Sequence, residues 1–277
     1  MPEVDVAALD HVETTLNYLD YTGERPAYYL YETEQGQVPP RPGADRQTVS
    51  VFDLRAIMDT VSLDENGFAA VRHSSSTSDF CNDGVIRTDY YPESEAIVKA
   101  RTGAIRVHAF DHNVRNKPLS EQDGSGIREP VRFVHNDYTE KSGPQRVRDL
   151  MGDEAEDLVQ CRFAFINVWR PLMQPVIDMP LAVCDAKSIE PSDFIATDLK
   201  YEDRTGEVYS VRHNPAHRWF YISQMRQDEV LLLKCFDSAR DGRARYSAHT
   251  AFKDPGAPAD APSRQSIEVR TIALFAS

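Results

Sequence analysis

The residues of this chain whose types and spacing could do chemistry centre on His135 and Asp137, which follow a short apolar run. On a β-strand, positions i and i+2 point to the same face, so the two side chains can bind one ion together. His249, far downstream, is the candidate third ligand. Two imidazoles and one carboxylate form a typical non-haem Fe(II) site, which leaves coordination positions open. The spacing therefore predicts an iron centre built from His135, Asp137 and His249.

A second chemical pattern, Arg264-Gln265-Ser266, follows His249 in the sequence. A 2-oxo acid could chelate the iron through two open positions and leave the third for O2. Its far carboxylate would then need a counter-charge, which arginine supplies with a fixed bidentate fork. Arg264 and Ser266 would share one face of a strand. We therefore expect Arg264, assisted by Ser266, to bind the carboxylate of such a cosubstrate.

His213 and His217 form a competing ligand set, because residues four apart share a helical face, as in zinc proteases. Pro215 lies between them and would break that helix, and no Glu follows His213 directly. A zinc helix is therefore disfavoured. Either histidine could still replace His249 as the third iron ligand.

A third histidine pair, His108 and His112, flanks Asp111. The following stretch, 111–129, is polar and contains glycine, which predicts a surface loop that could act as a lid. A polar turn is favoured here over a second metal site.

Composition excludes several classes of function. The chain has 277 residues and a formal charge of −13, which should repel phosphate backbones and anionic membrane surfaces. No apolar run is long enough to span a bilayer, and the acidic N-terminus lacks the features of a signal peptide. The four cysteines are scattered without C-x-x-C spacing, which disfavours disulfide scaffolds and thiolate zinc sites. A cytoplasmic protein acting on a small molecule, with no nucleic-acid or membrane partner, is expected.

The apolar pattern predicts many strands and few helices. Residues 1–48 are predicted to form an N-terminal arm, with some helical periodicity from Val4 to Leu19. Helices are expected at 89–102 and 145–158, and strands at 48–53, 104–110, 133–139, 161–171, 181–184, 194–196, 219–222, 230–236 and 264–275. No linker divides the chain, so we expect one domain over 1–277 with a barrel core over about 104–275. A mainly β fold with flanking helices (α+β), closed as a barrel or jelly roll, is the predicted class.

Several short motifs occur together in an order that resembles a known family. They are Tyr90-Tyr91-Pro92-Glu93, Thr102-Gly103-Ala104, Phe110-Asp111-His112, His135-Asn136-Asp137-Tyr138-Thr139, Ile166-Asn167-Val168-Trp169-Arg170-Pro171, Asn214-Pro215-Ala216-His217-Arg218-Trp219, Asp228-Glu229-Val230-Leu231-Leu232, Phe236-Asp237-Ser238, His249-Thr250-Ala251-Phe252 and Arg264-Gln265-Ser266-Ile267-Glu268-Val269-Arg270. Together they resemble the AsaB hydroxylase/desaturase, gibberellin desaturase and CmcJ family over roughly residues 20–275.

The resemblance implies a double-stranded β-helix oxygenase that uses Fe(II), 2-oxoglutarate and O2 in natural-product biosynthesis. It carries the metal roles to His135, Asp137 and His249, and the cosubstrate role to Arg264 with Ser266. Arg270 has the same strand parity as Arg264 and is the alternative carboxylate partner.

What the family implies about the reaction is less specific. The expected enzyme hydroxylates, desaturates or endoperoxidises a small, largely apolar natural product, such as a terpenoid or meroterpenoid, through a ferryl intermediate. Tyr138, Trp169 and Trp219 are candidates for the wall of the substrate pocket. Two alternative functions are a barrel that binds a small apolar ligand without turnover, and a cupin-like metal-dependent isomerase or hydrolase. The Tyr-rich arm suggests a homodimer.

Overall fold

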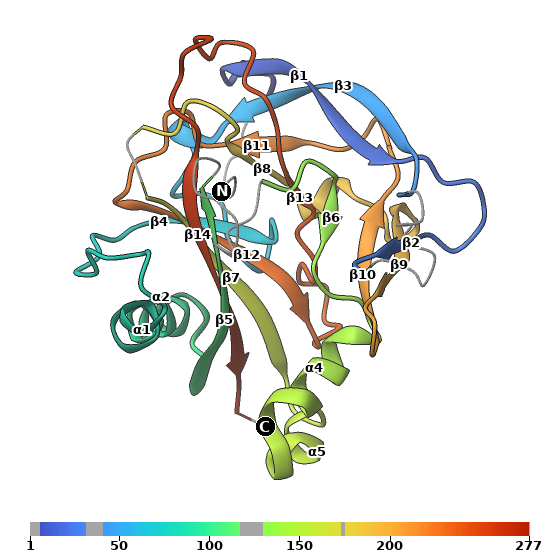
Figure 1. Cartoon of the computed structure of the whole chain (residues 1–277), viewed down its shortest axis with the longest axis vertical. Helices are drawn as coiled ribbons and strands as arrows, with labels where there is room; N and C mark the ends of the chain where they lie inside the picture. Colours follow the sequence, from blue (N-terminus) through green and yellow to red (C-terminus); the bar gives the residue numbers. More distant parts are fainter. Residues whose placement is uncertain (1–5, 32–40, 117–129, 173–174, 277) are drawn as a thin grey trace.

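Two β-sheets and a few helices build the fold of this computed structural model (Figure 1). The structure describes residues 6–31, 41–116, 130–172 and 175–276. Within these ranges the larger sheet has the strand order β1-β3-β11-β8-β13-β6-β10-β9-β2, and the smaller has the order β4-β12-β7-β14-β5.

The strands are β1 (His11–Leu19), β2 (Ala27–Tyr29), β3 (Ala44–Asp53), β4 (Phe68–Arg72), β5 (Arg106–Asn116), β6 (His135–Asn136), β7 (Phe163–Pro171), β8 (Leu181–Cys184), β9 (Phe194–Lys200), β10 (Thr205–Val211), β11 (Trp219–Tyr221), β12 (Glu229–Asp237), β13 (His249–Ala251) and β14 (Gln265–Leu274). The α-helices are α1 (Asp83–Val85), α2 (Tyr91–Thr102), α4 (Ser142–Met151) and α5 (Ala155–Leu158). Short 3-10 or π segments are η1 (Val6–Ala8), η2 (Leu54–Ala56), η3 (Ile86–Tyr90), η4 (Gly152–Glu154), η5 (Ala186–Ser188) and η6 (Pro191–Asp193).

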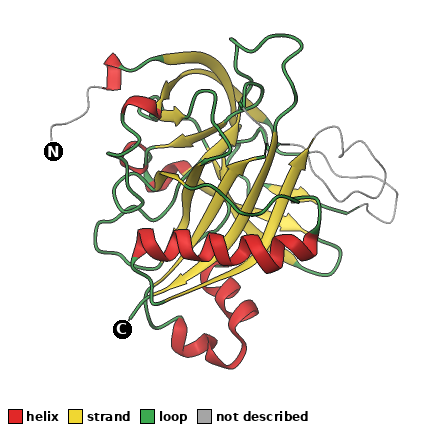
Figure 2. Cartoon of the chain, turned by 90° about the vertical axis from the view of Figure 1, so that its left-hand side faces the viewer, coloured by secondary structure: helices red, strands yellow, loops and turns green. Residues whose placement is uncertain are grey.

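The strands β12 and β7 at the centre of the smaller sheet are buried at every position, and most of their residues are apolar. On β12, Leu231 and Leu233 point into the core between the sheets, whereas Val230 and Leu232 pack in a separate cluster beneath α2. Figure 2 shows α2 lying across the outer face of this sheet. The predicted mainly β class with a jelly-roll core is confirmed.

The helix predicted at 89–102 is confirmed as α2, which η3 precedes. Pro92 lies in its first turn, and Gly103 ends it with a left-handed φ of 69°, a conformation that glycine adopts without strain. The second predicted helix begins three residues earlier than expected, at Ser142, and is interrupted at Gly152 (φ 53°) into α4, η4 and α5.

The N-terminal arm differs from its prediction. Instead of a helix, residues 11–19 form β1, which pairs antiparallel with β3 along its full length. The side chains of Thr14, Leu16 and Tyr18 alternate inward, and this two-residue period outweighs the weak helical one. The arm also supports the predicted iron centre, because the Asn17 carbonyl accepts a hydrogen bond from the Val134 N–H.

Only the first part of the stretch predicted as a lid, residues 111–116, lies within the described ranges. Residues 111–116 are not loop but continue β5, which pairs with β14 through a register shift beside Arg270. Residues 117–129 lie outside the described ranges. Among the described residues, no helix is both long and apolar enough to span a membrane.

Candidate metal centre

The three predicted metal ligands lie together. His135 on β6 and His249 on β13 are directly paired across the two strands, with ring centroids 4.4 Å apart. Asp137 follows β6, and its Oδ1 is 3.7 Å from His135 Nε2. One donor atom from each of the three residues lies within 4.8 Å of the others, and among the described residues this is the single such cluster. A two-residue strand and a three-residue strand thus position both imidazoles, and Asp137 is the residue directly after the first of them.

The imidazoles are oriented by their own backbone. His135 Nδ1 lies 2.8 Å from the Phe133 carbonyl, and His249 Nδ1 lies 2.9 Å from the Ser247 carbonyl. A carbonyl oxygen only accepts, so each Nδ1 must carry the proton and each Nε2 presents a lone pair. Burial, together with His249, lowers the pKa of His135 to about 4, so that this ring is neutral at neutral pH. Both rings are therefore prepared to bind a metal through Nε2.

The carboxylate is held from its other side. Asp137 Oδ2 accepts from Asn167 Nδ2 at 2.8 Å and from Arg270 Nε at 3.4 Å, which leaves Oδ1 facing the histidines. Burial alone would raise the pKa of Asp137. Arg270, the two imidazoles and the Asn167 amide outweigh it and hold that pKa well below its usual range. The third ligand is therefore an ionised carboxylate.

The two candidate arginines differ in their partners. Arg270 contacts three carboxylates: Asp111 at 2.8 Å, Glu268 at 3.3 Å and Asp137 at 3.4 Å. Arg264 is 4% exposed, donates from Nη1 to the Met179 carbonyl at 2.6 Å, and has no partner at Nε. Within the described ranges, no carboxylate lies at ion-pair distance from Arg264. Of these two arginines, Arg264 is therefore the one that lacks an anionic partner among the described residues.

The charge of Arg264 is preserved despite its burial. Burial and the nearby Arg115 lower the pKa of Arg264 to about 9, so the guanidinium stays protonated at neutral pH. Its charge also lies over the Trp169 ring, 5.4 Å from the centroid. A metal triad beside a buried cation with an open hydrogen-bonding edge can bind a bidentate acid at the metal and that acid's far carboxylate at the arginine.

Known proteins are similar to almost the whole chain. The family described as "Oxidoreductase/YMDC permease-like domain" matches residues 16–274. The Fe(II)/2-oxoglutarate-dependent dioxygenase nvfI of Aspergillus novofumigatus is 35% identical, over 88% of this chain and 89% of its own. The hydroxylase/desaturase efuI of Hormonema carpetanum is 34% identical, over 95% of each chain. This chain belongs to the Fe(II)/2-oxoglutarate-dependent dioxygenases.

Solved structures of the family confirm the fold of this dioxygenase. The iron and alpha-ketoglutarate-dependent endoperoxidase NvfI superposes with a TM-score of 0.87 at 30% identity, covering 96% of this chain and 99% of its own. The resemblance to the hydroxylase/desaturase family is confirmed, as is the expectation of an enzyme that uses Fe(II), 2-oxoglutarate and O2. The alternatives of a non-catalytic barrel and of an isomerase or hydrolase are excluded.

A cavity of about 30 Å³ in the dioxygenase joins the triad to Arg264. Trp169, Leu181 and Glu268 line it, and so does Arg115, which sequence reasoning missed. Arg115 lies on β5, which pairs with β14. It was missed because the sequence of this stretch predicted a loop. Ser266 is 1% exposed and has the same parity as Arg264, although it is not among the residues that line the cavity.

Of the three predicted pocket residues, only Trp169 lines this cavity. Tyr138 instead stacks on Phe165 in the core between the sheets, with ring centroids 4.3 Å apart. Trp219 lies in a different hydrophobic cluster, where its indole N–H donates to the Tyr18 hydroxyl at 2.7 Å. Neither of these two rings is therefore among the residues that line this cavity.

The competing histidines lie elsewhere. His217 is held between Tyr18 and Asp193, with 3.2 Å contacts on both ring nitrogens, and the His213 ring packs edge-on against Tyr18. Neither belongs to the metal cluster. His112, on β5, contacts the Tyr91 hydroxyl at 2.9 Å, and His108 lies 4.0 Å from Glu95. These two histidines are strand residues, which corrects the predicted polar turn.

Proposed function

We propose that His135, Asp137 and His249 hold the Fe(II) of this dioxygenase, within a single oxygenase domain that spans the chain. The observation that carries this assignment is that both Nε2 atoms and Asp137 Oδ1 converge while their other polar atoms are already engaged. Bound Fe(II) supplies the activation of O2, coupled to oxidative decarboxylation of 2-oxoglutarate. The chain's own contribution is to fix three ligands on one side of the ion.

Arg264 binds the far carboxylate of 2-oxoglutarate, and Ser266 assists. Its burial and the absence of a partner at Nε support this role. Arg270, which already contacts three carboxylates, holds Asp137 in place instead. Trp169 forms the apolar wall of the same site, and its ring fixes the Arg264 guanidinium from one side. These assignments divide the two arginines between cosubstrate and metal ligand.

The substrate is a small, largely apolar natural product of the terpenoid or meroterpenoid class. It is hydroxylated, desaturated or endoperoxidised. Relatives named hydroxylase/desaturase and endoperoxidase support this range of outcomes. The enzyme is cytoplasmic and works without nucleic acid, as its charge of −13 favours. It pairs as a homodimer through the N-terminal arm, where Tyr21 and Leu30 are exposed.

Anaerobic titration of the protein with Fe(II) and then 2-oxoglutarate tests the site. A weak visible charge-transfer band should form in the wild type and be lost in His135→Ala and Asp137→Ala. His108→Ala is the matched control, because this histidine is 49% exposed and lies outside the cluster. It should keep the band. Absence of the band from the intact protein would refute the iron assignment.

A further inference from the structure

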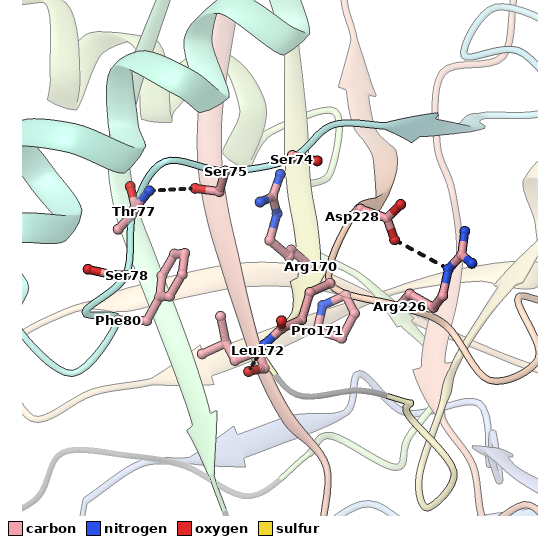
Figure 3. A pocket seen from close by; sticks show the side chains of 11 residues that line it. Ser74, Ser75, Thr77, Ser78, Phe80, Arg170, Pro171, Leu172, Arg226 and Asp228 are labelled. Atoms are coloured by element: carbon pink, nitrogen blue, oxygen red, sulfur yellow. Dashed lines mark hydrogen bonds and ion pairs between the residues drawn. The ribbon is translucent and has the colours of Figure 1, made fainter.

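The outer face of β7 carries a second cavity. It has a volume of about 580 Å³ and lies beside the C-terminal end of the strand, near the segment that follows β4 (Figure 3). Successive residues of a strand point to opposite faces, so Arg170 in this cavity and Trp169 in the iron site lie on opposite sides of the sheet. A molecule bound here would not occupy the iron site.

Arg170 is a buried cation without a counter-charge. Its side chain lies over the Tyr90 ring at 5.2 Å, and Nη2 donates to the His73 carbonyl at 2.9 Å. The residue is 2% exposed, and its Nε has no partner. No carboxylate of the described chain lies within ion-pair distance of it. Burying an unpaired charge is costly, so this position favours an anion.

A second orphaned donor lines the same cavity. Thr77 is 8% exposed and its Oγ1 has no partner, although its backbone N–H donates to Ser75 Oγ at 3.1 Å. Figure 3 shows the Arg170 guanidinium directed toward the segment that carries Ser74 and Ser75. Two unsatisfied buried donors in one cavity are unusual in a native protein and call for a ligand.

The remaining lining sets the shape of that ligand. Phe80, Pro171 and Leu172 supply an apolar wall beside the polar groups. On the far side, Arg226 is neutralised by Asp228, whose carboxylate lies 3.3 Å from its Nε. The free positive charge of the cavity is therefore concentrated at Arg170.

We propose that this cavity binds a small organic anion. Its acid group accepts hydrogen bonds from Arg170 Nε and the Thr77 hydroxyl, and its apolar body packs against Phe80 and Leu172. The volume lies within the usual range for small-molecule sites, about 300–1,000 Å³. A carboxylate fits the guanidinium edge, and a phosphate offers the same acceptors.

Calorimetric titration of the enzyme loaded anaerobically with Fe(II) and saturating 2-oxoglutarate tests this site, because the iron site is then filled. Benzoate probes a carboxylate with an apolar body, and inorganic phosphate probes the acid group alone. Benzoate should bind at one per chain, and Arg170→Gln should weaken it by about tenfold or more. Thr77→Val removes only the hydroxyl and should weaken binding by about threefold. Arg148→Gln, an exposed arginine paired with Glu156 on the α4–α5 segment, should change nothing.

The relative affinities of the two probes distinguish carboxylate ligands from phosphate ligands. Tighter binding of phosphate than of benzoate, lost in the same variants, assigns the site to phosphate-bearing ligands. Absence of binding by both probes overturns the proposal, as does binding that neither Arg170→Gln nor Thr77→Val alters. If Arg170→Gln does not fold, the effect of Thr77→Val on benzoate binding decides whether this cavity is the binding site. That variant should fold at least as stably as the wild type, because it removes a buried hydroxyl that has no partner.

Discussion

Each candidate imidazole ligand is oriented by a carbonyl two residues earlier in its own chain segment. His135 uses Phe133 and His249 uses Ser247. Because these hydrogen bonds are local, both tautomers are set before a metal binds, and little reorganisation is needed at binding. The same geometry separates His249 from His217, whose two ring nitrogens are both engaged.

Replacing His249 or His217 distinguishes a ligand from a structural histidine. His249→Ala should abolish stoichiometric Fe(II) binding, because two ligands remain. His217→Ala should leave the Fe(II) affinity unchanged but lower the free energy of unfolding by about 1–3 kcal/mol, since it leaves Asp193 and Tyr18 without their partner. Fe(II) competition against a chromophoric chelator and urea denaturation measure the two effects. The reverse pattern would move the third ligand to His217.

Arg264 and Arg270 should separate cosubstrate binding from metal binding. Arg264→Gln should raise the 2-oxoglutarate concentration needed for half-maximal turnover by about tenfold or more, because a charge-assisted pair is lost. Its Fe(II) affinity should be unchanged. Arg270→Gln should weaken Fe(II) by about 10–100-fold, because Asp137 loses a partner. Steady-state kinetics and the chelator competition provide the readouts.

The conservative variant Arg264→Lys supplies the control for this pair. It keeps the charge but loses the fork, so it should recover only part of the 2-oxoglutarate affinity. If Arg270→Gln raised the 2-oxoglutarate requirement while Arg264→Gln left it unchanged, the two roles would have to be exchanged.

Among the elements, those predictable from sequence are the ones whose local pattern agrees with their tertiary surroundings. β7 and β12 are mostly apolar because both of their faces are buried, and α2 carries its Pro and Gly where each is tolerated. β10 was missed because its largely half-exposed residues carry no strong alternation. β6 has only two residues and gains its strand geometry from β10 and β13 rather than from propensity.

Glu229, at the start of β12, joins that strand to η2. Its fully buried carboxylate accepts from Arg55 Nη1 at 2.9 Å and from the Arg226 N–H at 2.9 Å. Glu229→Gln keeps the shape but removes the charge, and should lower the free energy of unfolding by about 1–3 kcal/mol at pH 7. Urea denaturation of the two proteins measures the difference.

The pH dependence of that difference has a definite sign. Burial would raise the pKa of Glu229, but its hydrogen bonds with Arg55 and Arg226 outweigh burial and lower it. A carboxylate whose pKa is lower in the folded protein than in the unfolded chain stabilises the fold. This stabilisation is complete above the unfolded pKa of about 4.3 and is lost as the pH falls through the folded pKa. The gap between wild type and Glu229→Gln should thus be constant near neutrality and narrow below about pH 4. A gap that widens in acid would contradict the assigned shift.

At the scale of the whole molecule, the candidate site depends on pairings that no local pattern encodes. His135 and His249 meet because β6 and β13 are neighbours in the larger sheet, although the two residues are 114 positions apart in the sequence. Sequence spacing identified all three candidate ligands. It left Arg264 and Arg270 unresolved, because the two residues are six positions apart, just before β14 and within it, and so have the same strand parity. Their difference lies in Asp111 and Asp137, carboxylates brought to Arg270 from other parts of the chain.

The N-terminal arm should be integral to the core, and Tyr18 is the residue that tests it. His217 Nε2 faces the Asp193 carboxylate and therefore donates, so Nδ1 accepts from the Tyr18 hydroxyl, which itself accepts from Trp219. Tyr18→Phe would leave the buried Trp219 N–H and His217 Nδ1 unpaired, and should lower the free energy of unfolding by about 2–4 kcal/mol. Tyr21→Phe, at an exposed position of the same arm, should change it by less than about 0.5 kcal/mol. Urea denaturation should show the loss of stability in Tyr18→Phe, and titration with Fe(II) should show unchanged metal affinity. If Tyr18→Phe and Tyr21→Phe were equally stable, the arm would pack on the core without stabilising it.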